Sequence, residues 1–194
     1  MAIRNLTDLR AGLPRGGRLI GLDIGEKTIG MAVSDPDLRV ASPIGTVRRT
    51  KFTQDATELA RAMRDRAVTG LVLGLPVNMD GTEGPRCQSV RQFAQNLLER
   101  PQLFGGEPEI AFWDERLSTS AVERMMIGFD MTRKRRDEVV DKLAATYILQ
   151  GALDFLSRGG GGGLPPIAGG SGDGPGGWRH PDDDDGAGDG DGGA

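Results

Sequence analysis

The sequence predicts a single α/β domain. Three observations support this prediction: the 194 residues suffice for one core of ordinary size, short apolar runs alternate with segments of helical spacing, and the first strands precede any helix. A chain with this order of elements is expected to fold as an antiparallel meander followed by helical crossovers.

Strands are expected at five places. Residues 18–24 form an apolar run, and residues 28–35 follow it after a short glycine-containing turn, so the two segments are typical of a hairpin. A third strand is expected around residues 43–49. The short apolar segment 71–75 and the segment 109–114 supply the last two strands.

Two helices are expected between the later strands. The segment 53–68 has apolar residues at helical spacing. The next helix begins near Pro85, because proline suits a first helical turn, and it stops at Pro101.

Two more helices are expected after the strands. Ser120 and Glu123 form a capping box, which predicts a short helix through residue 127. The basic stretch 133–136 leads into the last helix. The expected buried stripe of that helix consists of Val139, Val140, Leu143, Ala144, Tyr147, Ile148 and Leu153.

Two terminal segments are expected to lie outside the folded domain, which spans residues 17–157. Residues 1–16 are predicted to be a flexible N-terminal extension. Residues 158–194 contain 16 Gly and 7 Asp and almost no aliphatic side chains, so we expect a disordered tail. The tail is either a solvating extension or an acidic mimic of nucleic acid that competes for basic protein surface.

Composition excludes several classes of function. The formal net charge of −4 comes from the tail, because residues 1–157 carry 22 basic and 21 acidic side chains, so a polyanionic partner stays open. The single cysteine and the single histidine exclude an internal disulfide and a Cys/His zinc cage. His180 lies in the tail, which also excludes a Ser-His or Cys-His couple. No apolar run reaches the ~20 residues of a membrane span and no signal peptide is expected, so the expected location is cytoplasmic.

The chemistry is therefore expected to depend on carboxylates. Asp23 lies inside an apolar run near the end of the first strand, where a carboxylate needs a cation or a proton unless it caps a turn. Asp114 and Glu115 end the fifth strand, where ligands bind in open α/β sheets, and an ion pair with Arg116 is the alternative. Asp141 lies in the last helix, and a solvated charge pair is its alternative.

Three or four carboxylates without histidine fit a hard cation and a phosphate substrate. Mg²⁺ takes oxygen ligands and keeps open positions for phosphate oxygens, and paired ions about 4 Å apart stabilise an in-line displacement. The loop 78–84 suits a grip on phosphate or sugar through Asn78, or it is simply good turn chemistry. A set of basic residues suits sequence-independent phosphate binding, or is a solvated face: Arg133, Lys134, Arg135 and Arg136.

Four ordered motifs resemble one family. They are GLDIGEKTIGMAVSD (21–35), GLPVNMDGTEGPR (74–86), DERLST (114–119) and VVDKLAATYILQ (139–150). Together they resemble the YqgF, or RuvX-like, family of candidate pre-16S rRNA nucleases, once described as Holliday junction resolvase-like. The resemblance covers roughly residues 16–156 and implies a ribonuclease H-like α/β fold, with a mixed five-stranded sheet and helices on both faces.

The resemblance also implies an activity, a cofactor and partners. The activity is metal-dependent hydrolysis of phosphodiester bonds, with processing of the 5′ end of pre-16S rRNA in ribosome biogenesis as the expected role. Asp23, Glu115 and Asp141 match the acidic triad of the family and would bind Mg²⁺ or Mn²⁺, with Asp114 as a further candidate. We expect a nucleic-acid partner, pre-rRNA first, no membrane, and a monomer or homodimer.

Other functions stay open at this point. A Holliday junction resolvase-like DNA endonuclease would use the same chemistry, and a noncatalytic nucleic-acid-binding module would retain the acids as relics. An actin-like ATPase also begins with an Asp-x-Gly hairpin, but it needs two such domains, and a core of about 157 residues supplies one. A Rossmann dehydrogenase is excluded, because Gly21, Gly25 and Gly30 lack the G-x-G-x-x-G spacing.

Overall fold

The computed structural model describes residues 3–117 and 133–159, with the backbone alone for residue 117 and residues 133–142. The strands are β1 (Ile3–Arg4), β2 (Arg18–Ile24), β3 (Thr28–Ser34), β4 (Ala41–Arg48), β5 (Val68–Leu75) and β6 (Glu109–Asp114). The helices are α1 (Leu6–Gly12), α2 (Phe52–Asp65), α3 (Pro85–Leu98), α4 (Pro101–Phe104), the 3-10 turn η1 (Glu115–Leu117) and α6 (Arg133–Ser157).

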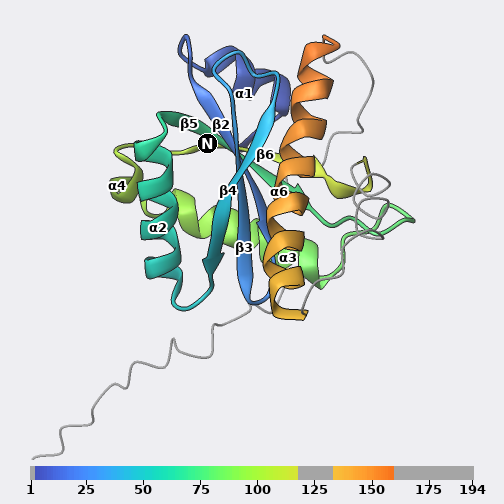
Figure 1. Ribbon diagram of the computed structural model, residues 1–194. Coiled ribbons are helices and arrows are strands. Elements are labelled where there is room, and N and C mark those ends of the chain that lie inside the picture. Colours follow the sequence, from blue (N-terminus) through green and yellow to red (C-terminus); the bar gives the residue numbers. More distant parts are fainter. Residues whose placement is uncertain (1–2, 118–132, 160–194) are drawn as a thin grey trace, which may run out of the picture.

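The strands form one mixed sheet in the order β1-β6-β5-β2-β3-β4 (Figure 1). β2, β3 and β4 pair antiparallel, which confirms the expected meander. β5 and β6 run parallel to β2, as helical crossovers require. The sheet has six strands where five were expected, because β1 adds to the edge of β6 in parallel.

The N-terminal segment differs from the flexible extension predicted for residues 1–16. β1 extends the sheet, and Arg4 forms an ion pair with Glu109 of β6. Asn5 caps α1 by accepting a hydrogen bond from a backbone N–H in its first turn. Leu6 and Leu9 are buried in the core, so residues 3–12 are part of the domain.

Substitution of Leu9 tests whether this segment contributes to stability. The Leu9 side chain is 1% exposed, so Leu9→Ala is expected to lower the free energy of unfolding by about 2–4 kcal/mol. Thr7→Ala is the control, because Thr7 is exposed on the same helix. Urea denaturation of both variants measures the difference. An unchanged free energy of unfolding in Leu9→Ala would show that the segment does not contribute to the stability of the domain.

Different helices cover the two faces of the sheet. α1 and α6 pack on one face, and α2 and α3 on the other (Figure 1). Side chains alternate between the faces along a strand. In β2, Leu22 and Ile24 belong to the core cluster under α2 and α3, whereas Leu19 belongs to the cluster under α6. Asp23 therefore lies on the α6 face.

Several element boundaries differ from the sequence prediction. α2 ends at Asp65 rather than at residue 68, and Ala67 turns the chain with a φ of 53° before β5 begins at Val68. Pro101 begins the short helix α4, so proline ends one helix and starts another. In the described part of the chain α6 starts at Arg133, so the basic stretch lies in the helix.

The buried stripe of α6 is also shifted. Ile148 and Leu153 are buried as expected, while Ala144 and Tyr147 are only half-buried.

Neither α6 nor any other described helix combines the length and apolar character needed to cross a membrane. The helix expected from Ser120 to residue 127 and nearly all of the tail lie outside the described residues. The buried stripe observed along α6 consists of Ala145, Ile148, Leu149, Ala152, Leu153 and Leu156.

A glycine in β2 sets the distance between the sheet and α6. A Cβ atom at Gly21 would lie 2.6 Å from Cβ of Leu149 and 2.9 Å from the backbone oxygen of Ala145. Both are shorter than real contacts of a Cβ atom, and both neighbours belong to the helix. The absence of a side chain at Gly21 is what allows α6 to lie against β2.

Candidate active site

Asp23 and Glu115 meet at one end of the sheet. Asp23 is half-buried near the end of β2, on the α6 face. Glu115 follows β6 directly, and its Oε1 lies 2.6 Å from the position that a Cβ atom at Gly74 would occupy. Gly74 is in β5, the neighbour of β2, and follows Leu73, which pairs with Leu22. The carboxylate of Glu115 therefore lies over the strand next to Asp23.

Glu115 is electrostatically coupled to its surroundings. Its pKa is raised to about 7, first by burial and then by the negative charges of Asp23 and Asp114, while Arg86 acts in the opposite direction. A carboxyl group with this pKa is partly protonated and partly ionised near neutral pH. A cation placed beside the pair would offset both the burial of the Glu115 charge and its repulsion by Asp23, so these two carboxylates fit a divalent metal.

Asp114 has a different environment. It is buried, and Arg116 donates hydrogen bonds to both of its carboxylate oxygens, the shortest being 2.6 Å from Nη2 to Oδ2. The backbone N–H of Arg116 donates a further bond to Oδ1. This is the ion pair that the sequence left open for Asp114. The carboxylate of Asp114 is therefore already paired with a cation of the same chain.

Asp141 lies in α6, in the part described by its backbone alone. α6 contacts Gly21 through Ala145 and Leu149, and Asp141 precedes Ala145 by one helical turn. Among the residues whose side chains are described, no group of three or more acids, cysteines or histidines lies close enough to hold a metal. The described part of the site is thus the pair Asp23 and Glu115.

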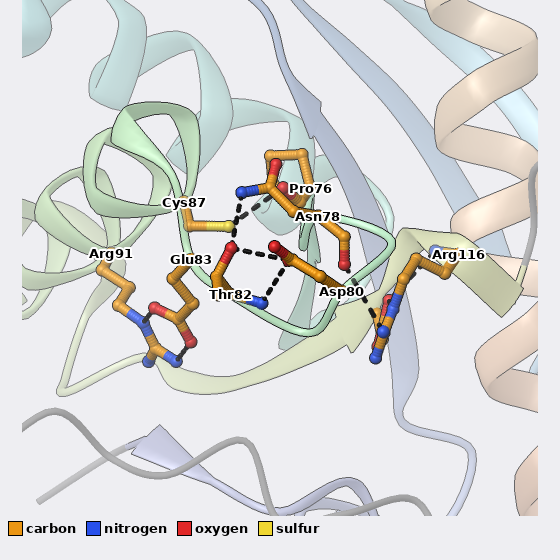
Figure 2. A network of polar contacts seen from close by, with 9 residues as sticks. Pro76, Asn78, Asp80, Thr82, Glu83, Cys87, Arg91 and Arg116 are labelled. Atoms are coloured by element: carbon orange, nitrogen blue, oxygen red, sulfur yellow. Dashed lines mark hydrogen bonds and ion pairs between the residues drawn. The ribbon is translucent and has the colours of Figure 1, made fainter.

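The loop that follows β5 forms the next wall of the site. Asn78 donates from Nδ2 to Oγ1 of Thr82, and Asp80 accepts from the backbone N–H and the hydroxyl of Thr82 (Figure 2). Gly81 completes the turn with a φ of 86°, where glycine is favoured. The expected turn-rich loop is confirmed, and the amide of Asn78 serves the loop itself.

A cavity of about 480 Å³ lies between this loop, the start of α3 and Glu115. Arg86 and Arg116 line it, and the sequence patterns predict no binding role for either. The signal for Arg86 was a cation directly after Pro85, in the first turn of a helix, where an acid is the favourable residue. Arg116 was identified only as a partner of Asp114.

The raised pKa of Glu115 predicts how stability depends on pH without metal. In the folded chain the pKa is about 7, above the ~4.3 of an unfolded glutamate, so the folded state holds an extra proton between these values. The free energy of unfolding should therefore fall as pH rises from 5 to 8. In EDTA at pH 8, Glu115→Gln should be more stable than the parent chain by roughly 1–3 kcal/mol.

Thermal melts in EDTA at pH 5, 6, 7 and 8 measure this effect. Glu115→Gln should flatten the dependence on pH, whereas Glu26→Gln, an exposed substitution in the β2–β3 turn, should leave it unchanged. An equal slope in the parent chain and in Glu115→Gln would contradict the assigned environment of Glu115.

The fold and the site together define a class of protein. Three antiparallel strands, two parallel crossover strands, helices on both faces and a carboxylate at the end of the central strand β2 make this a ribonuclease H-like protein. The family model described as RuvX, Holliday junction resolvase, matches residues 17–155. The chain belongs to the RuvX family.

Two curated proteins and one solved structure are similar to this chain. The chain is 82% identical over 159 residues to a protein of Rhodospirillum centenum named as a candidate pre-16S rRNA nuclease, covering 82% of this chain and 85% of the relative. A protein of Phenylobacterium zucineum with the same name is 59% identical over 157 residues, covering 80% and 98%. Among solved structures, Thermus thermophilus RuvC with a Holliday junction substrate is similar, with a TM-score of 0.47 and 12% identity over 74% of this chain and 96% of that one.

Proposed function

We propose that this chain is a metal-dependent nuclease that hydrolyses phosphodiester bonds at the 5′ end of pre-16S rRNA, in the cytoplasm, during ribosome biogenesis. The observation that carries the proposal is the pair Asp23 and Glu115, which lies at the end of the sheet beside a cavity lined by two arginines. The names of the relatives support RNA as the substrate.

The site residues have distinct roles in this proposal. Asp23, Glu115 and Asp141 would hold Mg²⁺ or Mn²⁺, and Asp114 would keep Arg116 in place. The cation, when bound, supplies positive charge for the oxygens of the scissile phosphate. Asp23 and Glu115 must then be ionised, which the raised pKa of Glu115 opposes without a cation.

Two further sets of residues would bind the nucleic acid. Asn78 lies in the loop that lines the cavity; one N–H of its amide bonds Thr82, and its other amide groups would contact phosphate or sugar beside the acids. The first turn of α6 carries Arg133, Lys134, Arg135 and Arg136, eight to five residues before Asp141. This basic turn would bind backbone phosphates without reading sequence. We propose that the chain acts as a monomer or as a homodimer.

The direct test is cleavage of an end-labelled transcript that spans the 5′ end of mature 16S rRNA. Cleavage should require Mg²⁺ or Mn²⁺ and stop in EDTA. A four-way DNA junction is the second substrate, because the family model is described as a Holliday junction resolvase. Cleavage of the junction alone would replace the RNA proposal, and binding without cleavage of either substrate would leave a noncatalytic module.

A further inference from the structure

The cavity beside Glu115 is bounded by a hydrogen-bonded loop and by an arginine, Arg86, that forms no ion pair among the described residues. Its volume of about 480 Å³ falls in the range of pockets for small organic ligands, ~300–1,000 Å³. Its lining includes Asn78, Met79, Arg86, Glu115 and Arg116. The cavity therefore adjoins Glu115 of the carboxylate pair, and two arginines line it as well.

The loop wall is held at both ends. Arg116, which is paired with Asp114 of β6, also reaches the backbone oxygen of Asn78 at 3.5 Å. At the other end, Glu83 accepts two hydrogen bonds from Arg91 of α3, at 2.5 and 2.7 Å (Figure 2). The Arg91–Glu83 pair is a two-point contact, which restricts geometry as well as position, whereas Arg116 holds the loop through one long hydrogen bond.

Arg86 differs from these two arginines. Among the described residues, Arg91 and Arg116 each form an ion pair, whereas Arg86 forms none and meets only the longer-range charge of Glu115. Its place in the first turn of α3, a turn that contains no acidic residue, sets it against the positive end of the helix dipole. Arg86 is exposed and free to turn toward an anion in the cavity.

Met79 adds an exposed apolar side chain to the rim of the cavity. Its side chain is 89% exposed, although the loop around it is fixed by hydrogen bonds. A flexible, polarizable thioether held out in water suits contact with the face of a nucleobase. Phosphate and base are thus matched by different residues of the same cavity.

We propose that the cavity binds one nucleotide unit of the substrate strand next to the scissile phosphodiester. Arg86 binds its phosphate and Met79 packs against its base. The inference rests on the proposed nuclease function and adds a subsite and two binding residues to it. Neither contact distinguishes one base from another, so this subsite positions the strand without reading its sequence.

The test is the salt dependence of binding to a fluorescent single-stranded RNA 12-mer of mixed sequence, measured by anisotropy in EDTA. Arg86→Ala should weaken binding by about 5–20-fold at low salt and lower the slope of log affinity against log salt by about 0.7, the contribution of one single-strand phosphate. Arg86→Lys should restore the slope, because lysine keeps the charge.

Two other variants complete the experiment. Arg61→Ala removes the same charge from the exposed side of α2, where Arg61 pairs with Asp65 of its own helix, and should leave both affinity and slope near the parent values. Met79→Ala should weaken binding about 2–10-fold and leave the slope unchanged, because the contact of a thioether with a base is not ionic.

The outcomes separate this inference from the function on which it rests. Equal affinity and slope for Arg86→Ala and Arg61→Ala, in a chain that binds and cleaves RNA, would overturn the subsite and leave the nuclease proposal standing. A parent chain that neither binds nor cleaves RNA would contradict both. Loss of affinity in Arg86→Ala with an unchanged slope would also overturn the phosphate contact.

Discussion

Replacement of Asp23 by asparagine is expected to reduce phosphodiester cleavage by at least about a thousandfold. The substitution keeps the shape of the side chain and removes the carboxylate whose charge acts on Glu115. Loss of metal-assisted charge stabilisation costs several kcal/mol of activation free energy, and each 1.36 kcal/mol is a factor of ten in rate. Single-turnover cleavage of the end-labelled transcript in Mg²⁺ measures the loss.

Two controls accompany the Asp23→Asn variant. Asp37→Asn makes the same change at an exposed position of the β3–β4 turn and should cleave at the parent rate. In EDTA, Asp23→Asn should melt no lower than the parent chain, because it removes a charge that repels Glu115. A parent-like cleavage rate in Asp23→Asn would remove Asp23 from the site.

The second large effect is expected from Gly21→Ala. The added methyl group would lie 2.6 Å from Leu149 and 2.9 Å from the backbone of Ala145, so α6 must move away from β2. Overpacking of this kind costs about 1–3 kcal/mol and more where backbone is involved. In a domain of this size, 3 kcal/mol lowers the melting temperature by roughly 6–12 °C. Cleavage should fall as well, because α6 carries Asp141 one turn before the contact.

Gly12→Ala is the matched control for Gly21→Ala. Gly12 is the last residue of α1, and a Cβ atom there would meet nothing within 4 Å. Alanine at this position should be neutral or stabilising by about 0.5–1 kcal/mol, because it is the better helix former. Scanning calorimetry measures the melting temperatures of the two variants. Similar values would show that the packing of α6 on β2 does not require glycine at position 21.

Local pattern was enough to predict the main strands. β2, β3, β5 and β6 are each runs of apolar residues bounded by turns or helices, and a central strand in a covered sheet has this composition. The pattern was insufficient for β1 and α1. A strand of two residues and a helix of seven are too short to show a period, and Leu9 is buried only because α6 and β6 lie beside it.

The same distinction holds for the site. The sequence by itself determined which carboxylates interrupt or follow apolar strands, and so identified Asp23, Asp114 and Glu115 as candidates. Only the tertiary structure separated their environments: it paired Asp114 with Arg116, laid Glu115 over Gly74 beside Asp23, and placed Arg86 at the cavity. The reason is physical, because pairing, burial and electrostatic coupling depend on groups far apart in the chain, and a sequence pattern reports only neighbours along it.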